Sequence, residues 1–373
     1  MAPTSPYILT FEQCDTGSHA RVGGKCASLG AMIQAGAPVP PGFAVTTEAY
    51  QEMLATGDLG QHIRSQLETL DPNDVNRIEA ISQAVRALIE QTPVAAGIEQ
   101  AIRAAYADLC QRCAMDEVPV AVRSSATAED LPGASFAGQQ DTFLWIVGIE
   151  EVLKHVRKCW SSLYTARAIT YRLEKGFPHE KISMSVGVQK MVNPKAAGVA
   201  FTLNPINGDR SKIAIDSSWG LGEAVVAGEV TPDNFLIDKV IFEVVSRAIS
   251  PKHIEYVLDP AANRVVQRAV EPERQMQPSL TEEELVAVAK MAKRAERFYG
   301  NPQDVEWAVD ADLAPPDNVV ILQSRPETVW SQQARPSISA GKAAGMAGLV
   351  DTLITGVRIK PARGAEGGGK EGA

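Results

Sequence analysis

Four polar residues near the C-terminal end have the types and spacing of a site for Mg²⁺ and a triphosphate. Asp304 and Glu306 lie two residues apart, and so do Gln323 and Arg325. Residues two apart share one face of a strand, so each pair projects together if DVEWAVD and NVVILQSRP form a hairpin. Carboxylate and amide oxygens suit Mg²⁺, and a guanidinium offers a fork of N–H donors to phosphate. A solvated polar face with a cross-strand ion pair remains the alternative.

The neighbouring residues of this hairpin are apolar. Val305 and Trp307 alternate with the acids, and Val320 and Leu322 precede the amide. We expect these four side chains to face the core, so that both faces of the hairpin are used.

A second group follows the apolar strand VPVAVRSSA. Arg123 stands at the end of its apolar part, and the loop after it contains Gly133 and Gly138. Glycines let backbone N–H groups approach an anion, and such a loop can close over phosphates as a lid. The alternative is a plain surface loop with an exposed arginine.

Two further glycine-containing turns are weaker signals. Lys25 follows a glycine pair, but His19 and Cys26 occupy positions where a P-loop requires Gly and Ser or Thr, so a lysine at a turn is the simpler interpretation. Glu223 follows Gly222 at an expected helix start, where its carboxylate either reaches a metal or favours the helix dipole.

The five cysteines do not form a recognisable framework. Cys110 and Cys113 are the one close pair, and they lie in a helical pattern without a second pair that would complete four zinc ligands. We interpret them as ordinary helix cysteines of a protein in a reducing compartment.

The elements that must position these residues can be outlined from periodicity. A helical stretch over about 50–115 precedes the strand of Arg123, and residues 150–173 are predicted to form one long amphipathic helix. Strands dominate from Ile182 onward, interrupted by a helix in which Thr281 and Glu284 form a capping box. The glycine-rich end is typical of a flexible tail.

Composition restricts the class of protein. The chain of 373 residues has 45% hydrophobic residues and a formal net charge of −9, which is enough for two or three packed subdomains and unfavourable for nucleic-acid binding. It has neither a signal-peptide pattern nor an apolar run long enough to span a bilayer. We therefore expect a cytoplasmic protein.

Five segments in this order resemble a known family. VGGKCASLG, VAVRSSATAEDLPGASFAGQQDTF, VQKMV, GLGEAVVAG and ILQSRPET are similar to motifs of the N-terminal nucleotide-binding domain of phosphoenolpyruvate synthase, pyruvate phosphate dikinase and rifampin phosphotransferase. The resemblance spans roughly residues 22–327.

The resemblance implies an α+β ATP-grasp fold in which two subdomains with mostly antiparallel sheets clasp ATP and Mg²⁺. Residues 1–200 would form the N-terminal subdomain, with a helical insert at about 50–115 and a lid-like loop at about 123–142. Residues 201–330 would form the C-terminal subdomain, and 331–373 a linker or flexible tail.

The resemblance also assigns roles to individual residues. Lys25 and Arg123 would contact the phosphates, with Gly138 and Thr142 on the lid-like loop. The adenine and ribose pocket would be lined by Gln189, Lys190, Met191 and Val192. Glu306 and Gln323 would serve the metal or the nucleotide, Arg325 would stabilise charge on the phosphoryl groups, and Asp304 and Glu223 would be further metal ligands.

In that family, ATP gives its β and γ phosphates to a histidine in a separate domain and leaves as AMP. None of the five histidines here has the sequence context of that phosphohistidine. We therefore expect one subunit of a split, dikinase-type ATP-dependent phosphotransferase, similar to the ATP-binding subunit of phenylphosphate synthase. A partner subunit would carry the phosphohistidine and bind phenol or another small acceptor.

Two other functions remain compatible with the motifs. A stand-alone ATP-grasp ligase would release ADP, and a nucleotide-sensing regulatory subunit would bind ATP without turnover. The complete set of charge-neutralising residues argues against the sensor, because a sensor does not need all of them. Residues 337–356 would dock the partner or form a disordered linker.

Overall fold

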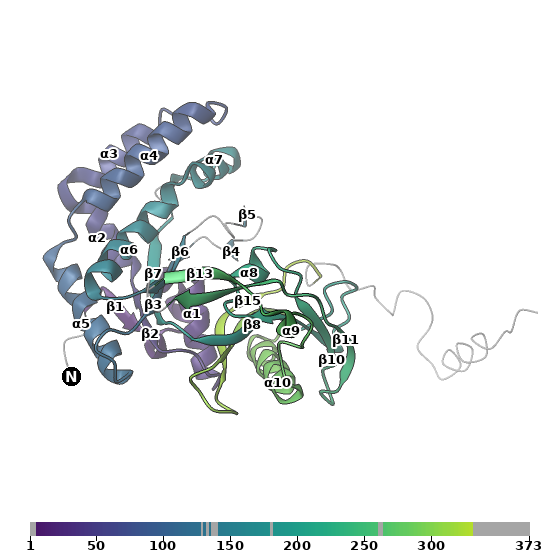
Figure 1. Ribbon diagram of the computed structural model, residues 1–373. Helices are drawn as coiled ribbons and strands as arrows, with labels where there is room; N and C mark the ends of the chain where they lie inside the picture. The colour runs from purple at the N-terminus through teal and green to yellow at the C-terminus, as the bar shows by residue number, and fades with distance from the viewer. Residues whose placement is uncertain are drawn as a thin grey trace, which may run out of the picture. The chain divides into compact units, whose positions relative to one another are not determined.

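The structure is a computed structural model that describes residues 5–127, 130–131, 134–135, 141–179, 182–259 and 264–330. Nine residues of the predicted lid-like loop, including Gly133 and Gly138, lie outside the described residues, and so does the predicted tail from residue 331 onward. The described residues form helices, two large antiparallel sheets and two separate pairs of antiparallel strands (Figure 1). This confirms the predicted α+β class.

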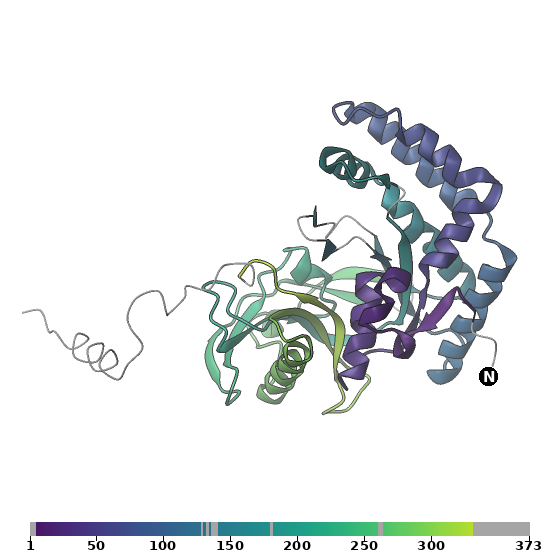
Figure 2. The same cartoon turned by 180° about the vertical axis from the view of Figure 1, so that it is seen from behind.

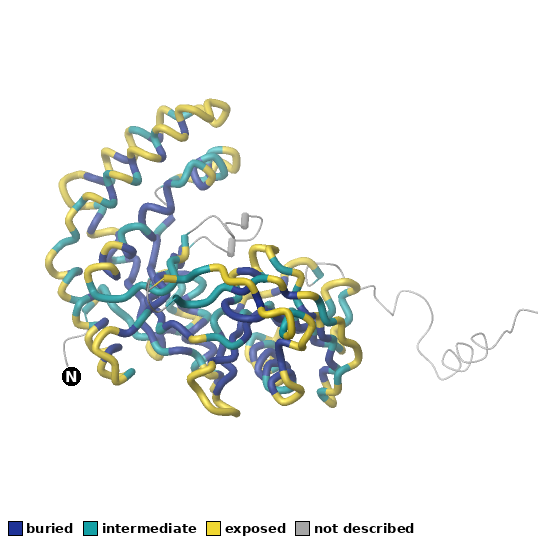
Figure 3. Tube along the Cα trace, in the orientation of Figure 1, coloured by how far each residue is buried: buried dark blue, intermediate teal, exposed yellow. Residues whose placement is uncertain are grey.

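The first sheet has five strands in the order β1-β2-β7-β3-β6, and every neighbouring pair is antiparallel. Its central strands are apolar and buried on both faces, as Figure 3 shows in dark blue. A two-residue pair, β4 and β5, lies between β3 and β6 in the chain. The strands are β1 (Ile8–Thr10), β2 (Gly42–Val45), β3 (Val120–Ala126), β4 (Asp130–Leu131), β5 (Ala134–Ser135), β6 (Thr142–Ile146) and β7 (Met184–Lys190).

Helices surround this sheet and bury their apolar stripes against it and against one another. In the helical stretch, Ile78, Val85 and Ile89 of α4 are buried at the expected helical spacing, and Asp74 caps the helix by accepting from the Arg77 N–H. The helices are α1 (His19–Gln34), α2 (Thr47–Ala55), α3 (Leu59–Leu67), α4 (Val75–Gln91), α5 (Ala96–Arg112), α6 (Ile149–Ser161) and α7 (Ala166–Lys175), with short 3₁₀ turns at 11–13, 16–18, 56–58 and 162–164.

The prediction of one long helix over 150–173 was wrong. Helix α6 ends at Ser161 and a new helix, α7, begins at Ala166. The Thr165 hydroxyl accepts from the Ala168 N–H and so caps the new helix. Serine and threonine side chains compete with the helix for backbone groups, and this cluster of them supplies the break.

The second sheet has six strands in the order β11-β10-β9-β8-β14-β15, again antiparallel throughout. A separate hairpin is formed by β12 and β13. The strands are β8 (Pro194–Phe201), β9 (Lys212–Trp219), β10 (Asp233–Asp238), β11 (Val244–Ala248), β12 (Ile254–Asp259), β13 (Arg264–Ala269), β14 (Gln303–Asp310) and β15 (Val319–Pro326); the helices are α8 (Glu223–Val226), α9 (Pro272–Gln275) and α10 (Glu282–Tyr299).

Helix α10 covers one face of the second sheet and completes its core. The helix starts at the predicted capping box, in which Thr281 and Glu284 bond each other's backbone N–H groups. Its buried Leu285, Val288 and Ala292 belong to the same apolar cluster as Trp307 of β14. The sheet therefore has one face held by a core and one face free for a site.

The chain passes from the first sheet to the second between Lys190, the end of β7, and Pro194, the start of β8. This crossing lies shortly before the subdomain boundary that we predict after residue 200. Because the chain up to Trp330 forms one compact unit, the division into subdomains stays a prediction.

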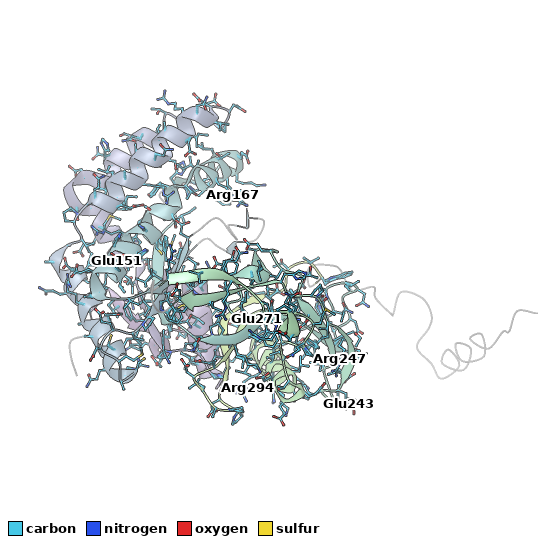
Figure 4. All side chains as sticks on the ribbon, viewed as in Figure 1. Glu151, Arg167, Glu243, Arg247, Glu271 and Arg294 are labelled. Carbon is cyan, nitrogen blue, oxygen red and sulfur yellow. The ribbon has the colours of Figure 1, made fainter. Side chains whose placement is uncertain are left out.

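Helix α1 packs against both sheets. It contacts β3 and β7 of the first sheet and β15 of the second (Figure 2). The Ser28 hydroxyl donates to the Ser324 carbonyl at 2.6 Å, and Arg294 of α10, labelled in Figure 4, donates to the Gly36 carbonyl at the end of α1. The edge of β15 is thus fixed beside the first sheet.

Candidate nucleotide-binding site

A cavity of about 560 Å³ lies where strands of the two sheets meet. Residues from β3, β6 and β7 line one side, and residues from β8, β14, β15 and the α8 region line the other. Its lining includes eleven of the residues predicted for the site: Lys25, Arg123, Thr142, Gln189, Lys190, Met191, Val192, Glu223, Glu306, Gln323 and Arg325. Asp304 is not part of the lining, and Gly138 lies outside the described residues.

Arg123 connects the two sides of the cavity. It is the one partly exposed residue of β3, whose other residues are buried. Its Nη1 donates to the Leu322 carbonyl of β15 at 3.3 Å, while its Nε has no hydrogen-bond partner among the described residues. Burial lowers the pKa of the guanidinium and the charge of Glu306 opposes that shift, so the group stays cationic.

Lys25 reaches the same cavity because α1 is broken at Gly23. Gly23 has φ 68° and ψ 174°, and a Cβ there would lie 2.1 Å from the Ser125 carbonyl oxygen. This close approach places the following turn of α1 against β3, where the Lys25 ammonium donates to the Ser124 carbonyl at 3.1 Å. The expected lysine at a turn is therefore a lysine just after a helix break, pointing into the site.

The C-terminal hairpin forms as predicted, with β14 and β15 antiparallel. Glu306 pairs with Gln323 in the ladder and Asp304 pairs with Arg325, so each acid stands opposite an amide or a guanidinium. The Arg325 Nε lies 3.6 Å from the Asp304 Oδ2. The polar face thus has a cross-strand ion pair at one position and residues that line the cavity at the next.

Three of the four neighbouring apolar side chains, Val305, Trp307 and Val320, are buried as expected, whereas Leu322 is partly buried and lines the cavity. The register shifts by one residue between Glu306 and Trp307. Trp307 packs in the core under α10, whereas Val320 and Leu322 belong to a small cluster with Val192 on the cavity side. The extra residue is a β-bulge in β15, which reverses the alternation and cannot be read from hydrophobic pattern alone.

Asp304 has an unusual carboxyl group. Burial raises its pKa to about 6, helped by the charges of Glu327 and Glu306 and opposed by Arg325. Its Oδ1 is buried and has no hydrogen-bond partner in the described part of the chain. The group therefore sits behind the cavity wall as a partner of Arg325.

One end of the cavity is apolar, and the sequence reasoning missed most of it. Ala121, Leu144 and Leu221 pack with Met191 into one cluster that lines the cavity. The period of two along a strand was the available signal, since Ala121 lies two residues before Arg123 and Leu144 two after Thr142. Leu221 gave no such signal, because it lies in a turn rather than on a strand and the period of two does not apply there.

A Mg²⁺ ion fits the polar end of the cavity. Within the described ranges, no group of three or more His, Cys, Asp or Glu side chains gathers at metal-binding distance. Mg²⁺ commonly uses one or two carboxylates and completes its octahedron with water and phosphate oxygens, so such a cluster is not required. Glu306 and Gln323 are cross-strand neighbours that line the cavity and offer suitable oxygens, and Glu223 at the start of α8 lines it too.

The arrangement as a whole has the chemistry of a nucleotide site. Lys25, Arg123 and Arg325 place cationic groups along the cavity, with the carboxylate of Glu306 beside them. An apolar end accepts a base, and cations with one or two carboxylates accept a phosphate chain and its metal.

The cysteines are free thiols, and Cys110 is buried on α5 as expected for a helix cysteine.

No helix among the described residues is long and apolar enough to cross a membrane.

Comparison with known proteins identifies a family of nucleotide-binding domains. The family model for the pyruvate phosphate dikinase AMP/ATP-binding domain matches residues 19–345. The chain is 43% identical to a probable phosphoenolpyruvate synthase of Staphylothermus marinus over 87% of this chain and 42% of that protein. It is 45% identical to a probable phosphoenolpyruvate synthase of Methanothermobacter thermautotrophicus, over 87% and 46% respectively. It is 40% identical to the phosphoenolpyruvate synthase of Pyrococcus furiosus, over 88% and 44%. The chain thus spans less than half the length of these relatives.

Proposed function

Because this chain belongs to the pyruvate phosphate dikinase AMP/ATP-binding domain family, we propose that it binds ATP and Mg²⁺ and passes phosphate from ATP to a histidine, with release of AMP. The observation that carries the proposal is the cavity itself. It brings Lys25, Arg123 and Arg325 from three distant parts of the chain to one place beside Glu306. Phosphoryl transfer requires this kind of positioning and charge neutralisation and little other chemistry from side chains.

We place the adenine at the apolar end of the cavity. Leu144, Met191 and Leu221 provide flat apolar contact area there, and Gln189, Lys190 and Val192 complete the wall as the resemblance implies. The buried Gln189 side chain donates to the Pro40 carbonyl at 3.4 Å, which leaves its amide oxygen as an acceptor. A base amino group would find an acceptor in that amide.

The phosphates would extend toward the three cations. Arg123 is held by the Leu322 carbonyl, and its buried Nε has no hydrogen-bond partner among the described residues, so a phosphate oxygen would supply the missing acceptor. Arg325 is held by Asp304 in the same way. Mg²⁺, when bound by Glu306 and Gln323, would neutralise charge on the β and γ phosphates.

The accepting histidine would come from outside this cavity. Among the described residues, no histidine lines the cavity. We propose that a partner subunit supplies the phosphohistidine and binds the final acceptor, with phenol as the first candidate because of the likeness to the ATP-binding subunit of phenylphosphate synthase. The same chemistry would be served if the histidine lay in a further domain of a longer chain, since the relatives extend well beyond the part that matches this chain.

The proposal is tested by separating nucleotides after the chain is incubated with Mg²⁺ and ATP. A histidine-bearing domain from one of the relatives is added or omitted, and phenol and pyruvate are tried as acceptors. AMP that requires the histidine-bearing domain supports the proposal. ADP as the sole product would replace it by a ligase, and ATP binding without turnover in every mixture would replace it by a nucleotide sensor.

A further inference from the structure

A second cavity, of about 1030 Å³, lies on the helical side of the first sheet and shares no lining residue with the nucleotide cavity. Its walls come from α2, α3, the last turns of α7 and the segments 176–179 and 182–183. Figure 1 shows α7 facing α3 and α4 on that side of the molecule. A cavity of this size is large enough for a small molecule.

An arginine is buried in the wall of this cavity. Arg172 of α7 is only 2% exposed, and its Nε donates to the Nδ1 of His179 at 2.8 Å. Its Nη2 is buried without a hydrogen-bond partner, and within the described ranges it forms no ion pair with an acidic side chain. Two features partly compensate this charge: the Tyr164 ring, whose centroid lies 5.7 Å from the guanidinium carbon, and the C-terminal end of α7, in whose last turn Arg172 lies.

His179 adds a second donor beside this guanidinium. Because its Nδ1 accepts from Arg172, the ring proton must sit on Nε2, which is buried and has no partner among the described residues. Burial and the charge of Arg172 lower the pKa of His179 to about 4. At neutral pH the pair therefore offers one positive charge and two unused N–H donors.

An uncompensated buried charge is costly, and a buried donor without an acceptor adds to that cost. A carboxylate or phosphate satisfies both, since its oxygens accept from a guanidinium edge and from a neighbouring N–H together. The remaining walls include Leu54, Ile63, Leu67 and Phe177, which favour an apolar body on the bound molecule. Glu68, an exposed residue of the lining, disfavours a second negative group at its position.

We infer that this cavity binds a small organic anion whose carboxylate or phosphate group is held by Arg172 and His179 and whose apolar part packs against α2 and α3. The site lies apart from the nucleotide cavity and is independent of the proposed reaction. It gives the helical region a ligand of its own.

The test is calorimetric titration of the whole chain with benzoate, succinate and inorganic phosphate as separate probes. Benzoate and succinate report a carboxylate site, and inorganic phosphate reports a phosphate site. We expect saturable binding of at least one probe, weakened about tenfold or more in Arg172→Met, because a hydrogen-bonded charge is lost. Arg103→Met, which removes a partly exposed arginine paired with Glu99 and Glu150, is the matched control and should bind as the wild type does.

Two further variants keep the result independent of folding and of the nucleotide cavity. Leu67→Trp fills the apolar wall without touching either donor and should also abolish binding, while Arg325→Met should leave it unchanged. Thermal melting of each variant verifies that it is folded, and the bound anion should raise the pKa of His179 in an NMR titration. Equal affinity in Arg172→Met, loss of binding in Arg325→Met, or no saturable binding of any probe would overturn the inference.

Discussion

The Nε of Arg325 lies 3.6 Å from the Oδ2 of Asp304, directly across the β14–β15 ladder. The Arg325 side chain is 48% exposed toward the cavity, whereas that of Asp304 is 16% exposed. The carboxylate thus holds the guanidinium from the buried side and leaves its outer edge for a ligand. This relationship distinguishes the two residues in position, because Arg325 lines the cavity and Asp304 is its partly buried ion-pair partner.

Replacing Arg325 by alanine should abolish transfer and leave the fold intact. The exposed guanidinium contributes little to stability, but a group that neutralises phosphoryl charge in the transition state is worth about a hundredfold or more in rate. AMP formation with the histidine-bearing domain is the measurement, together with thermal melting. Arg247→Ala is the control. Arg247 (Figure 4), on β11 of the second sheet, has a side chain that is 47% exposed and forms an ion pair with Glu282 at the start of α10. Turnover of Arg325→Ala close to that of this control would remove Arg325 from the site.

Asp304 should make stability fall as pH rises. Its pKa in the folded protein is about 6, above the ordinary value of 3.8, so between these values the folded state binds more protons than the unfolded state. The resulting stabilisation is present below about pH 4 and is lost as pH rises through about 6. Urea unfolding at several pH values should therefore show a changing difference between the two proteins. As pH rises from about 4 to about 6, the free energy of unfolding of Asp304→Asn should increase by about 1 to 3 kcal/mol relative to that of the wild type. A constant difference across that range would contradict the assigned environment.

Much of the architecture was predictable because its signals are local. The buried strand around Arg123, the β14–β15 hairpin and the capping box of α10 each depend on residues close together in sequence, and all three are found. The predicted site residues were identified by family motifs, and the fold then brings eleven of them to one cavity.

The remaining features depend on contacts between distant segments. The bulge in β15 is set by how Glu306 and Trp307 meet their partners on another strand, so it left Leu322 on an unexpected face. Strand parity places Asp304 on the same face as Glu306 but cannot tell which of the two lines the cavity, so the role of Asp304 as a metal ligand stays a prediction. The break of the long helix after Ser161 has a local cause, the capping residue Thr165. The apolar residues continue at helical spacing through this break, so periodicity alone predicted one helix.

Gly23→Ala should be much more damaging than an alanine at another left-handed glycine. A Cβ at Gly23 would meet the Ser125 carbonyl oxygen at 2.1 Å, whereas Gly57, with φ 56°, has nothing within 4 Å of its Cβ position. Both variants place a side chain at a positive φ, which costs on the order of 1 to 3 kcal/mol. Gly23, with ψ 174°, lies in a backbone region almost reserved for glycine, and its variant must also move α1 away from β3. Urea unfolding should show Gly23→Ala destabilised by at least about 2 kcal/mol more than Gly57→Ala, with weaker ATP binding through the displaced Lys25. Equal losses in the two variants would mean that the approach of α1 to β3 is not tightly constrained.

The two ends of the nucleotide cavity should be separable by ligand. Leu221 is buried in the apolar cluster and lines the cavity, so Leu221→Ala removes contact area from the base and leaves the cations in place. We expect ATP to bind about ten times more weakly to this variant, since roughly 1 to 2 kcal/mol of apolar contact is lost, while inorganic tripolyphosphate binds as to the wild type. Lys25→Met should weaken both ligands, because the ammonium faces the phosphate end. Calorimetric titration of the four combinations provides the measurement, and a loss of tripolyphosphate binding in Leu221→Ala would reverse the proposed orientation of ATP.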